Sequence, residues 1–420
     1  MSERGTKRAG TGGFDGAGEG DSEGDGGVVS AQPARRQIEL AEDRYAAELA
    51  FLAGWDRGPR PPGWRLTPRA VVVFVCGSGG EPLRAAAGNG VEGAPAGDGP
   101  HELVVARKFV GDRALVERCV VTLAGERGLL LVGEPGTAKS MLSELLAAAV
   151  CGTSGLTVQG TAGTTEDQVR YGWNYASLLA NGPSRAALVP SPVLTAMTRG
   201  AVARIEEITR CLPEVQDALV SILSERRMAV PELADSGDGT DGTGHAVPGF
   251  TVIATANLRD RGVSEMSAAL KRRFNFETVG PIDDLDTETA LVRAQATAAL
   301  ARGGAEFAVD QAVLEALVTA FRDLRGGQSA EGWEVERPST VMSTAEAVHV
   351  ATSMGLAAAY LPDGRDPLRT LPGHLLGTVR KDDPADHARL LGYWDGPVRR
   401  RAEQGAPLWR TLWELRDALG

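Results

Sequence analysis

The stretch of residues 129–140, LLLVGEPGTAKS, constrains the fold of this chain more than any other. Its first four residues form the short apolar run that a buried parallel strand needs, and a Gly/Pro turn follows at once. The apolar residues after Ser140 recur at helical spacing. The sequence therefore predicts a strand, a glycine-rich loop and an amphipathic helix in immediate succession. A loop in that context can cradle phosphate groups, although the motif alone also fits a plain turn between a core strand and a helix.

The loop departs from the phosphate-binding pattern at one position, because Ala138 stands where a glycine is expected before the lysine. Alanine avoids positive φ, so we expect Ala138 to be helix-like and to belong to the first turn of the following helix. Lys139 would reach the β- and γ-phosphate oxygens of a nucleotide, and Ser140 would hold Mg²⁺. The predicted nucleotide-binding residues are Gly133, Glu134, Pro135, Gly136, Thr137, Ala138, Lys139, Ser140 and Met141.

A second apolar segment ends in paired acids. Residues 201–207, AVARIEE, predict a strand that closes on Glu206 and Glu207. Downstream of a phosphate loop, one acid of such a pair binds the magnesium shell and the other activates the attacking water. We therefore assign Glu206 to Mg²⁺ and Glu207 to catalysis, although two glutamates at a strand end are by themselves typical of a solvated turn. Arg204 is unusually polar for such a strand, and nothing in the pattern explains it.

Two further segments complete the candidate site. Residues 250–256, FTVIATA, predict another buried strand, which ends at Asn257, and an amide there can orient the lytic water. Residues 267–276, SAALKRRFNF, place Arg272 and Arg273 at a helix end. The helix dipole alone favours basic residues there. The alternative is an arginine finger that stabilises transition-state charge in a neighbouring subunit, with Arg273 the first candidate and Arg272 the second.

Composition limits the remaining classes of function. The 420 residues include 44 Lys and Arg against 55 Asp and Glu, a net charge of −11, which argues against binding nucleic acid or anionic membranes by overall attraction. The N-terminus has no apolar core, and no run of about 18 apolar residues occurs, so we expect a cytoplasmic protein without a signal peptide or membrane span. The 4 cysteines are too scattered for a metal knuckle, and we expect free thiols.

With the motifs in this order, residues 109–350 resemble the AAA+ ATPases, in particular the MoxR type. GEPGTAKS is similar to Walker A, RIEE to Walker B, ATAN to sensor 1 and ALKRRF to the arginine-finger segment. The TTED to NGPS region is similar to the helix-two insert, and the 227–250 hairpin to the pre-sensor-1 insert. The resemblance implies an α/β core whose five-stranded parallel sheet has the order 5-1-4-3-2 and is flanked by helices, followed by an all-α lid. Ala345 stands where that family has its sensor-2 arginine, and Arg337 is the candidate substitute.

Composition shifts and helical periodicity divide the chain into five predicted segments. These are a disordered Gly/Asp-rich tail (1–34), an N-terminal segment with a Gly/Ala/Pro-rich insertion (35–100), the nucleotide-binding core (101–281), a helical lid (282–361) and a C-terminal helical extension (362–420). Within them, residues 70–76 read as a strand or a short helix, and 228–233 and 250–256 as the two arms of a hairpin. The apolar face of the last helix, around Trp409 and Trp413, would pack on the lid or dock a partner.

The resemblance implies a function as well as a fold. A MoxR-type protein uses ATP and Mg²⁺, assembles into a ring, here expected to be a hexamer, and acts as a chaperone-like remodelling ATPase with a von Willebrand A-domain partner on a client protein. Membrane and nucleic-acid partners are not expected. The aromatic residues Tyr171, Trp173 and Tyr175 would either anchor a loop or grip a client. The alternatives are a nucleic-acid motor subunit, such as a helicase or translocase, and a nucleotide-gated scaffold with little turnover.

Overall fold

The structure of this chain is a computed structural model that describes seven stretches of residues: 39–84, 102–234, 242–257, 264–306, 308–361, 366–381 and 383–420. The predicted tail, most of the predicted insertion before residue 101 and residues 235–241 of the predicted hairpin lie outside the described residues. The division of the chain into five segments stays a prediction.

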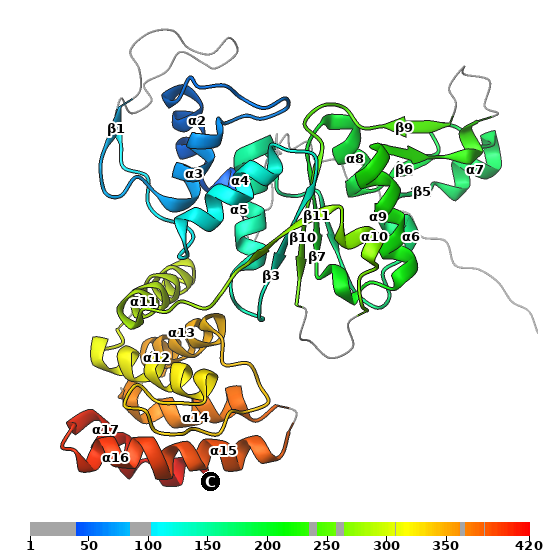
Figure 1. Ribbon diagram of the computed structural model, residues 1–420. Coiled ribbons are helices and arrows are strands. Elements are labelled where there is room, and N and C mark those ends of the chain that lie inside the picture. The colour runs from blue at the N-terminus through cyan, green and yellow to red at the C-terminus, as the bar shows by residue number, and fades with distance from the viewer. Residues whose placement is uncertain are drawn as a thin grey trace, which may run out of the picture. The chain divides into compact units, whose positions relative to one another are not determined.

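A parallel sheet forms the centre of the core (Figure 1). Its strands are β3 (Gly128–Val132), β4 (Thr157–Gln159), β7 (Val202–Glu206), β10 (Thr251–Ala256) and β11 (Phe274–Thr278). All pairings are parallel, and the spatial order is β11-β3-β10-β7-β4. Counted along the chain this is 5-1-4-3-2, so the expected sheet is confirmed. Every residue of the three inner strands is buried, which explains their nearly continuous apolar sequence.

Helices cover both faces of this sheet. Leu129 and Leu131 of β3 pack in one apolar cluster with the helices α2 (Ala46–Trp55), α3 (Pro68–Cys76), α4 (Arg113–Leu123) and α5 (Lys139–Cys151), and the short α1 (Ala41–Arg44) lies beside α5. Leu130 and Val132 point to the other face, where α8 (Pro192–Arg199) and α9 (Pro213–Glu225) pack. Residues 70–76 therefore belong to a helix, which the Thr67 hydroxyl caps at Ala70 N.

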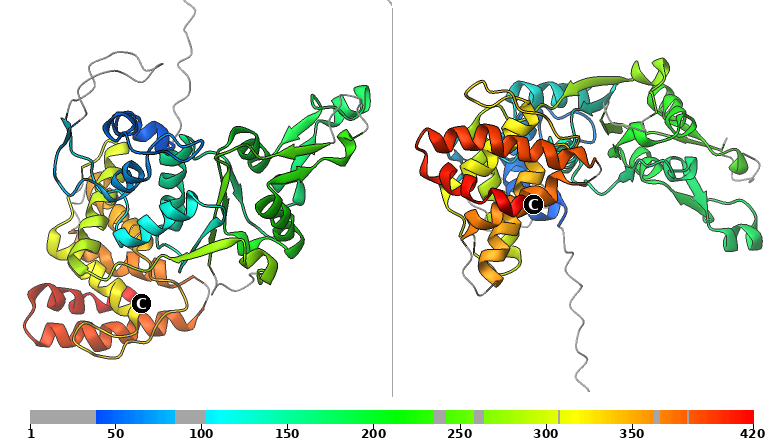
Figure 2. Two further views of the ribbon diagram at one scale, coloured as in Figure 1. Left: turned by 45° about the horizontal axis from the view of Figure 1, so that its top comes forward. Right: turned by 90° about the horizontal axis from the view of Figure 1, so that it is seen from below.

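Short elements precede the first core strand or lie between the core strands. They are β1 (Leu83–Arg84) paired with β2 (Glu102–Leu103), β5 (Tyr171–Trp173) with β6 (Leu188–Pro190), β8 (Arg227–Ala229) with β9 (Thr243–His245), the helices α6 (Glu166–Val169), α7 (Tyr175–Asn181) and α10 (Ala268–Lys271), and the 3₁₀ turns η1 (Ile208–Arg210) and η2 (Pro231–Leu233). Strands β6 and β9 contact α8. The β5–β6 and β8–β9 pairs extend away from the central sheet, with α7 near their outer end (Figure 2).

The prediction that residues 228–233 and 250–256 form the two arms of a hairpin is wrong. The strand at residues 250–256 does not pair with 228–233, because its mainly apolar sequence suits a buried position in the sheet interior, between β3 and β7. The short strand β8 pairs instead with β9, whose residues Thr243–His245 lie between the two predicted arms.

Helices make up the C-terminal part. They are α11 (Leu285–Arg302), α12 (Gln311–Gly326), α13 (Thr344–Tyr360), α14 (Pro367–Val379), α15 (Ala385–Tyr393), the π-helical turn η3 (Trp394–Val398), α16 (Arg399–Glu403), α17 (Pro407–Glu414) and the 3₁₀ turn η4 (Arg416–Leu419). A single apolar cluster runs from α11 to η4, and Trp409 and Trp413 pack against it. Trp394 is 1% exposed in this cluster, and its Nε1 donates to the Leu412 carbonyl oxygen at 2.9 Å. The last helix thus packs on the lid helices.

The described helices include none that is both long enough and apolar enough to cross a bilayer. All 4 cysteines are free thiols, as expected, and Cys119 and Cys211 are buried. Burial raises the pKa of Cys119 to about 12, so this thiol is an inert part of the core.

Candidate functional site

The phosphate-binding candidate is the loop between β3 and α5. Ala138 has φ 64° and ψ 24°, the left-handed conformation, and stands immediately before the first helical residue. The expectation that it would be helix-like is therefore wrong: the loop keeps the backbone turn that a glycine would adopt, at a cost to alanine of about 1–2 kcal/mol. Gly133 allows no side chain at all, since a Cβ there would lie 2.3 Å from the Val279 carbonyl oxygen.

Lys139 lies at the centre of this loop and is only 5% exposed. Its Nζ donates to the carbonyl oxygens of Gly133 at 2.9 Å and Glu134 at 2.8 Å. Burial lowers the pKa of Lys139, while the charges of Glu207, Glu206 and Glu134 act to raise it. The ammonium group is therefore held inside the loop, where the phosphates of a nucleotide would be its stronger partners.

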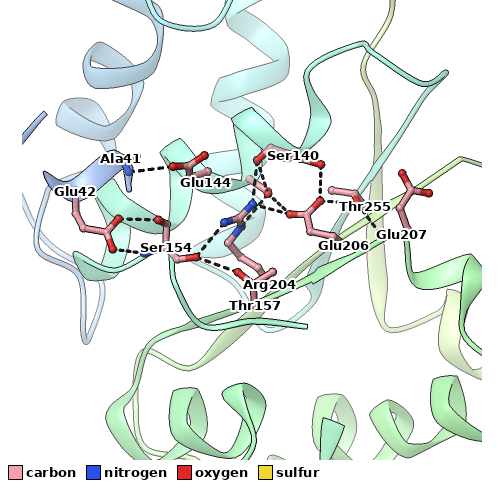
Figure 3. A network of polar contacts seen from close by, with 11 residues as sticks. Ala41, Glu42, Ser140, Glu144, Ser154, Thr157, Arg204, Glu206, Glu207 and Thr255 are labelled. Carbon is pink, nitrogen blue, oxygen red and sulfur yellow. Dashed lines mark hydrogen bonds and ion pairs between the residues drawn. The ribbon is translucent and has the colours of Figure 1, made fainter. Parts of the chain in front are cut away.

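Glu206 closes strand β7 and faces the first turn of α5 (Figure 3). Its Oε2 accepts from Ser140 Oγ at 2.6 Å and from Thr255 Oγ1 at 2.8 Å, and Ser143 Oγ is 2.7 Å from its Oε1. Burial acts to raise the pKa of Glu206, but the hydrogen bonds from Ser140 and Ser143, with the charge of Arg204, hold it below its ordinary value. The structure thus brings the two predicted magnesium residues, Ser140 and Glu206, into direct contact.

Glu207 follows directly and has the left-handed conformation, with φ 55° and ψ 47°. Its backbone N donates to Thr255 Oγ1 at 2.9 Å. Its Oε2 is buried without a hydrogen bond among the described residues, and Arg210 Nε is 3.8 Å away. In the described part of the chain, three non-glycine residues have positive φ, and two of them, Ala138 and Glu207, are at this site. Such strain is typical of functional sites.

Two cavities adjoin the loop and share the segment 280–282. The phosphate-loop cavity, about 380 Å³, is lined by residues 135–141, Glu207 and several side chains of α11 and α13, among them Ala345. The Asn257 cavity, about 580 Å³, is lined by Gly133, Glu134, Asn257 and the lid residues Arg322 and Arg325. Residues 133 and 134 of the predicted phosphate loop thus line the Asn257 cavity, and residues 135–141 line the phosphate-loop cavity together with Glu207.

The lid presents no arginine at the expected sensor-2 position, because Ala345 lines the phosphate-loop cavity there. The candidate substitute, Arg337, is exposed, donates to the Gly326 carbonyl oxygen and lines neither of these two cavities. Arg322 and Arg325 were not singled out from the sequence, since two arginines three residues apart on a helix form no motif. Each lies 2.9 Å from Oε2 of Glu288, which is 0% exposed.

The two finger candidates follow helix α10 and line neither cavity. Arg273 is engaged within the chain: its Nε donates to Ser224 Oγ at 2.7 Å and its Nη1 to the Ala269 carbonyl oxygen at 2.7 Å. Arg272 is exposed, and its guanidinium has no hydrogen bond or ion pair with the residues that the structure describes. Of the two, Arg272 has the side chain that can reach another molecule without losing contacts.

The residues at the loop fit Mg²⁺ only together with a nucleotide. The described residues contain no group of three or more His, Cys, Asp or Glu side chains that could hold a metal. Mg²⁺ at phosphate sites keeps several waters and takes one or two protein ligands with the phosphate oxygens. A hydroxyl and a carboxylate in contact, Ser140 and Glu206, supply that donor set.

Two family models match the chain. One, described as the AAA domain of the dynein-related subfamily, matches residues 128–274, and the other, described as the YehL-like AAA+ ATPase C-terminal domain, matches residues 286–420. The uncharacterized protein YehL of Escherichia coli (strain K12) is 45% identical over 375 residues, which cover 89% of this chain and 95% of that protein. The uncharacterized protein SH1500 of Staphylococcus haemolyticus (strain JCSC1435) is 26% identical over 56% of this chain and 81% of its own length.

Solved structures are more distant. A putative ATPase from Cytophaga hutchinsonii has a TM-score of 0.32 and 20% identity, and the match covers 44% of this chain and about half, 51%, of that one. The structure of NtrX from Brucella abortus in complex with ATP has a TM-score of 0.43 and 12% identity, over 74% of this chain and 70% of that one. At these TM-scores and sequence identities, the similarity to the two solved structures does not indicate a function.

Proposed function

The chain belongs to the YehL-like family of AAA+ ATPases, and from this premise we propose that it binds and hydrolyses ATP with Mg²⁺ as a MoxR-type remodelling ATPase. The observation that carries the proposal is the arrangement behind the phosphate loop, where Ser140, Glu206 and Thr255 are joined by hydrogen bonds and Glu207 faces the phosphate-loop cavity. A hydroxyl, a buried carboxylate and a second carboxylate at a strand end are the parts that phosphoryl transfer to water requires.

Each predicted residue then has a role. The backbone N–H groups of residues 133–141 other than Pro135, which include the start of α5, would bind the phosphates, and Lys139 would exchange its two carbonyl partners for phosphate oxygens. Ser140 and Glu206 would hold Mg²⁺, which when bound neutralises charge on the phosphate oxygens. Glu207 would take the proton of the attacking water, since its Oε2 has no hydrogen-bond donor among the described residues. Asn257 would orient that water.

The position of the finger candidates supports a ring. Because Arg272 and Arg273 line neither cavity of their own chain, a transition-state contact from either one requires a neighbouring copy. We therefore propose a cytoplasmic homo-oligomeric ring, hexameric by resemblance, that works with a von Willebrand A-domain protein on a client protein. Tyr175 and Leu179 of α7 are 70% and 88% exposed, which supports a client-contacting surface there.

Hydrolysis by the assembled protein tests the proposal. Wild type should turn over ATP only with Mg²⁺, and Glu207→Gln should bind ATP normally while its turnover falls by about 10²–10⁴-fold, the usual share of a general base. Glu225→Gln is the matched control, because Glu225 is an exposed glutamate that pairs with Arg227 outside the site. Equal turnover in Glu207→Gln and wild type would contradict the assignment.

One observation favours a second candidate, a nucleotide-gated scaffold with little turnover. Ala345 in the phosphate-loop cavity removes a positive charge that the family places against the nucleotide. A scaffold would bind ATP in the ring without measurable hydrolysis, and Ala345→Arg would then raise turnover. An active wild-type ring excludes this candidate.

A further inference from the structure

Arg204 is a charged residue in the interior of the central sheet. All five residues of β7 are buried, and Arg204 itself is 8% exposed. Burying a guanidinium costs free energy unless its N–H groups are paired. The hydrogen-bond partners of Arg204 therefore indicate its role in the strand. The partners are Glu206, the first turns of α5 and the Ser154 carbonyl oxygen.

The guanidinium spans four acceptors (Figure 3). Its Nη2 donates to Glu206 Oε1 at 2.7 Å and to the Ser140 carbonyl oxygen at 3.1 Å, and its Nε donates to Ser143 Oγ at 3.0 Å. Its Nη1 donates to the Ser154 carbonyl oxygen at 3.0 Å. Arg204 thus occupies Oε1 of Glu206, which leaves Oε2 turned toward the hydroxyls of Ser140 and Thr255.

The same network continues to the N-terminal helix α1. Ser154 donates from its backbone N to Glu42 Oε1 at 2.9 Å and from its Oγ to Glu42 Oε2 at 2.7 Å. The neighbouring Ala41 N donates to Glu144 Oε1 of α5 at 2.9 Å. Glu42 therefore accepts from both the backbone N–H and the hydroxyl of Ser154, whose carbonyl oxygen accepts from Arg204. A continuous path of hydrogen bonds joins α1 to Glu206.

We propose that Arg204 is a positioning residue of the magnesium site, which holds Glu206 with Oε2 toward Ser140, and that Glu42 supports Arg204 through Ser154. The inference rests on the proposed function. Mg²⁺ tolerates little departure from octahedral geometry, so a carboxylate free to rotate is a poorer partner for it. Residues that orient a metal's protein partners in this way change metal affinity or activity by about 10–100-fold when they are replaced.

Calorimetric binding of a non-hydrolysable ATP analogue, once with Mg²⁺ and once with EDTA, separates this role from a structural one. Wild type should bind more tightly with Mg²⁺. In Arg204→Met, the gain in affinity that Mg²⁺ provides should be smaller than in wild type by about 10-fold or more. The affinity of this variant in EDTA should stay close to that of wild type. Arg204→Lys should recover part of the gain, because lysine keeps the charge but lacks the planar fork that reaches several acceptors.

The matched control is Arg401→Met. Arg401 is also a buried arginine, 5% exposed, which pairs with Asp323 at 2.8 Å and Glu331 at 2.7 Å among the C-terminal helices. This variant should lose thermal stability and keep the full magnesium-dependent gain. An Arg204→Met protein that melts earlier than wild type but keeps that gain would reduce Arg204 to a structural role and overturn the inference.

If Arg204→Met does not fold, Glu42→Ala provides the test, because Glu42 lies in α1 and its replacement leaves the residues of the central sheet unchanged. Its magnesium-dependent gain should fall in the same direction as that of Arg204→Met, and an unchanged gain would overturn the support through Ser154. A wild-type protein whose affinity is the same with Mg²⁺ and with EDTA would contradict the proposed function itself, and the inference with it.

Discussion

Replacing Ala138 by glycine should relieve a strain that the phosphate loop carries. The left-handed conformation at φ 64° costs alanine about 1–2 kcal/mol and costs glycine almost nothing. Against this gain, the greater backbone freedom of glycine favours the unfolded chain by about 0.4–1 kcal/mol. It also removes a half-buried methyl group, worth roughly 0.4 kcal/mol at about half of a fully buried CH₂. The net expectation is a stabilisation of about 0.5 kcal/mol.

A second alanine makes this prediction sharper. Ala298 is an exposed residue in the interior of α11, where glycine should destabilise by about 0.5–1 kcal/mol. Both substitutions share the entropy gained by the unfolded chain, so the difference between them, about 1–2 kcal/mol, reports the strain at Ala138. Denaturant unfolding of the two variants measures it. Equal destabilisation by Ala138→Gly and Ala298→Gly would refute the strain and the backbone geometry from which it was worked out.

Four further predictions concern the C-terminal helices and the ring. Because the hydrogen bond from Arg401 lowers the pKa of Glu331 from 4.5 to about 2, stability should fall as the pH drops from 4.5 to about 2. Glu331→Gln should remove that part of an acid-unfolding curve, and an unchanged curve would contradict the pairing. Trp394→Ala should cost about 3–5 kcal/mol in urea unfolding, as expected for the loss of a fully buried Trp. Arg272→Ala should leave ATP affinity intact and lower turnover only in the assembled ring, and normal turnover would leave Arg273 as the finger. Ala345→Arg should tighten the binding of ATP more than that of ADP, and equal effects on both would show that position 345 does not face the γ-phosphate.

The central sheet was predictable because buried parallel strands leave a strong signal. Residues 129–132 are all apolar, and 250–256 are apolar except for Thr251 and Thr255. Ordered motifs at the ends of these strands fixed the sheet order by resemblance. The hairpin prediction failed because the true partner strand leaves no signal. A strand of only three residues, such as Thr243–His245, is too short to show a hydrophobic pattern.

The candidate site was predictable where chemistry follows a motif and was missed where it depends on tertiary contacts. Ser140 and Glu206 are 66 positions apart, and the motifs alone anticipated that they meet. The conformation of Ala138 could not be deduced, because residue propensity favours the opposite outcome and the loop overrides it. Arg204 did leave a signal, a charge inside an apolar strand, but its partner Ser154 and the support from Glu42 are visible only in the folded chain.

The most direct test of the account is the heat released when a non-hydrolysable ATP analogue and Mg²⁺ are titrated into wild type and into Lys139→Met. Lys139 Nζ lies at the centre of the phosphate loop, bound to two of the loop's own carbonyl oxygens. Wild type should show saturable binding at one site per chain, and Lys139→Met should lose this binding. Binding of equal affinity in both proteins would contradict the claim that this loop holds the triphosphate.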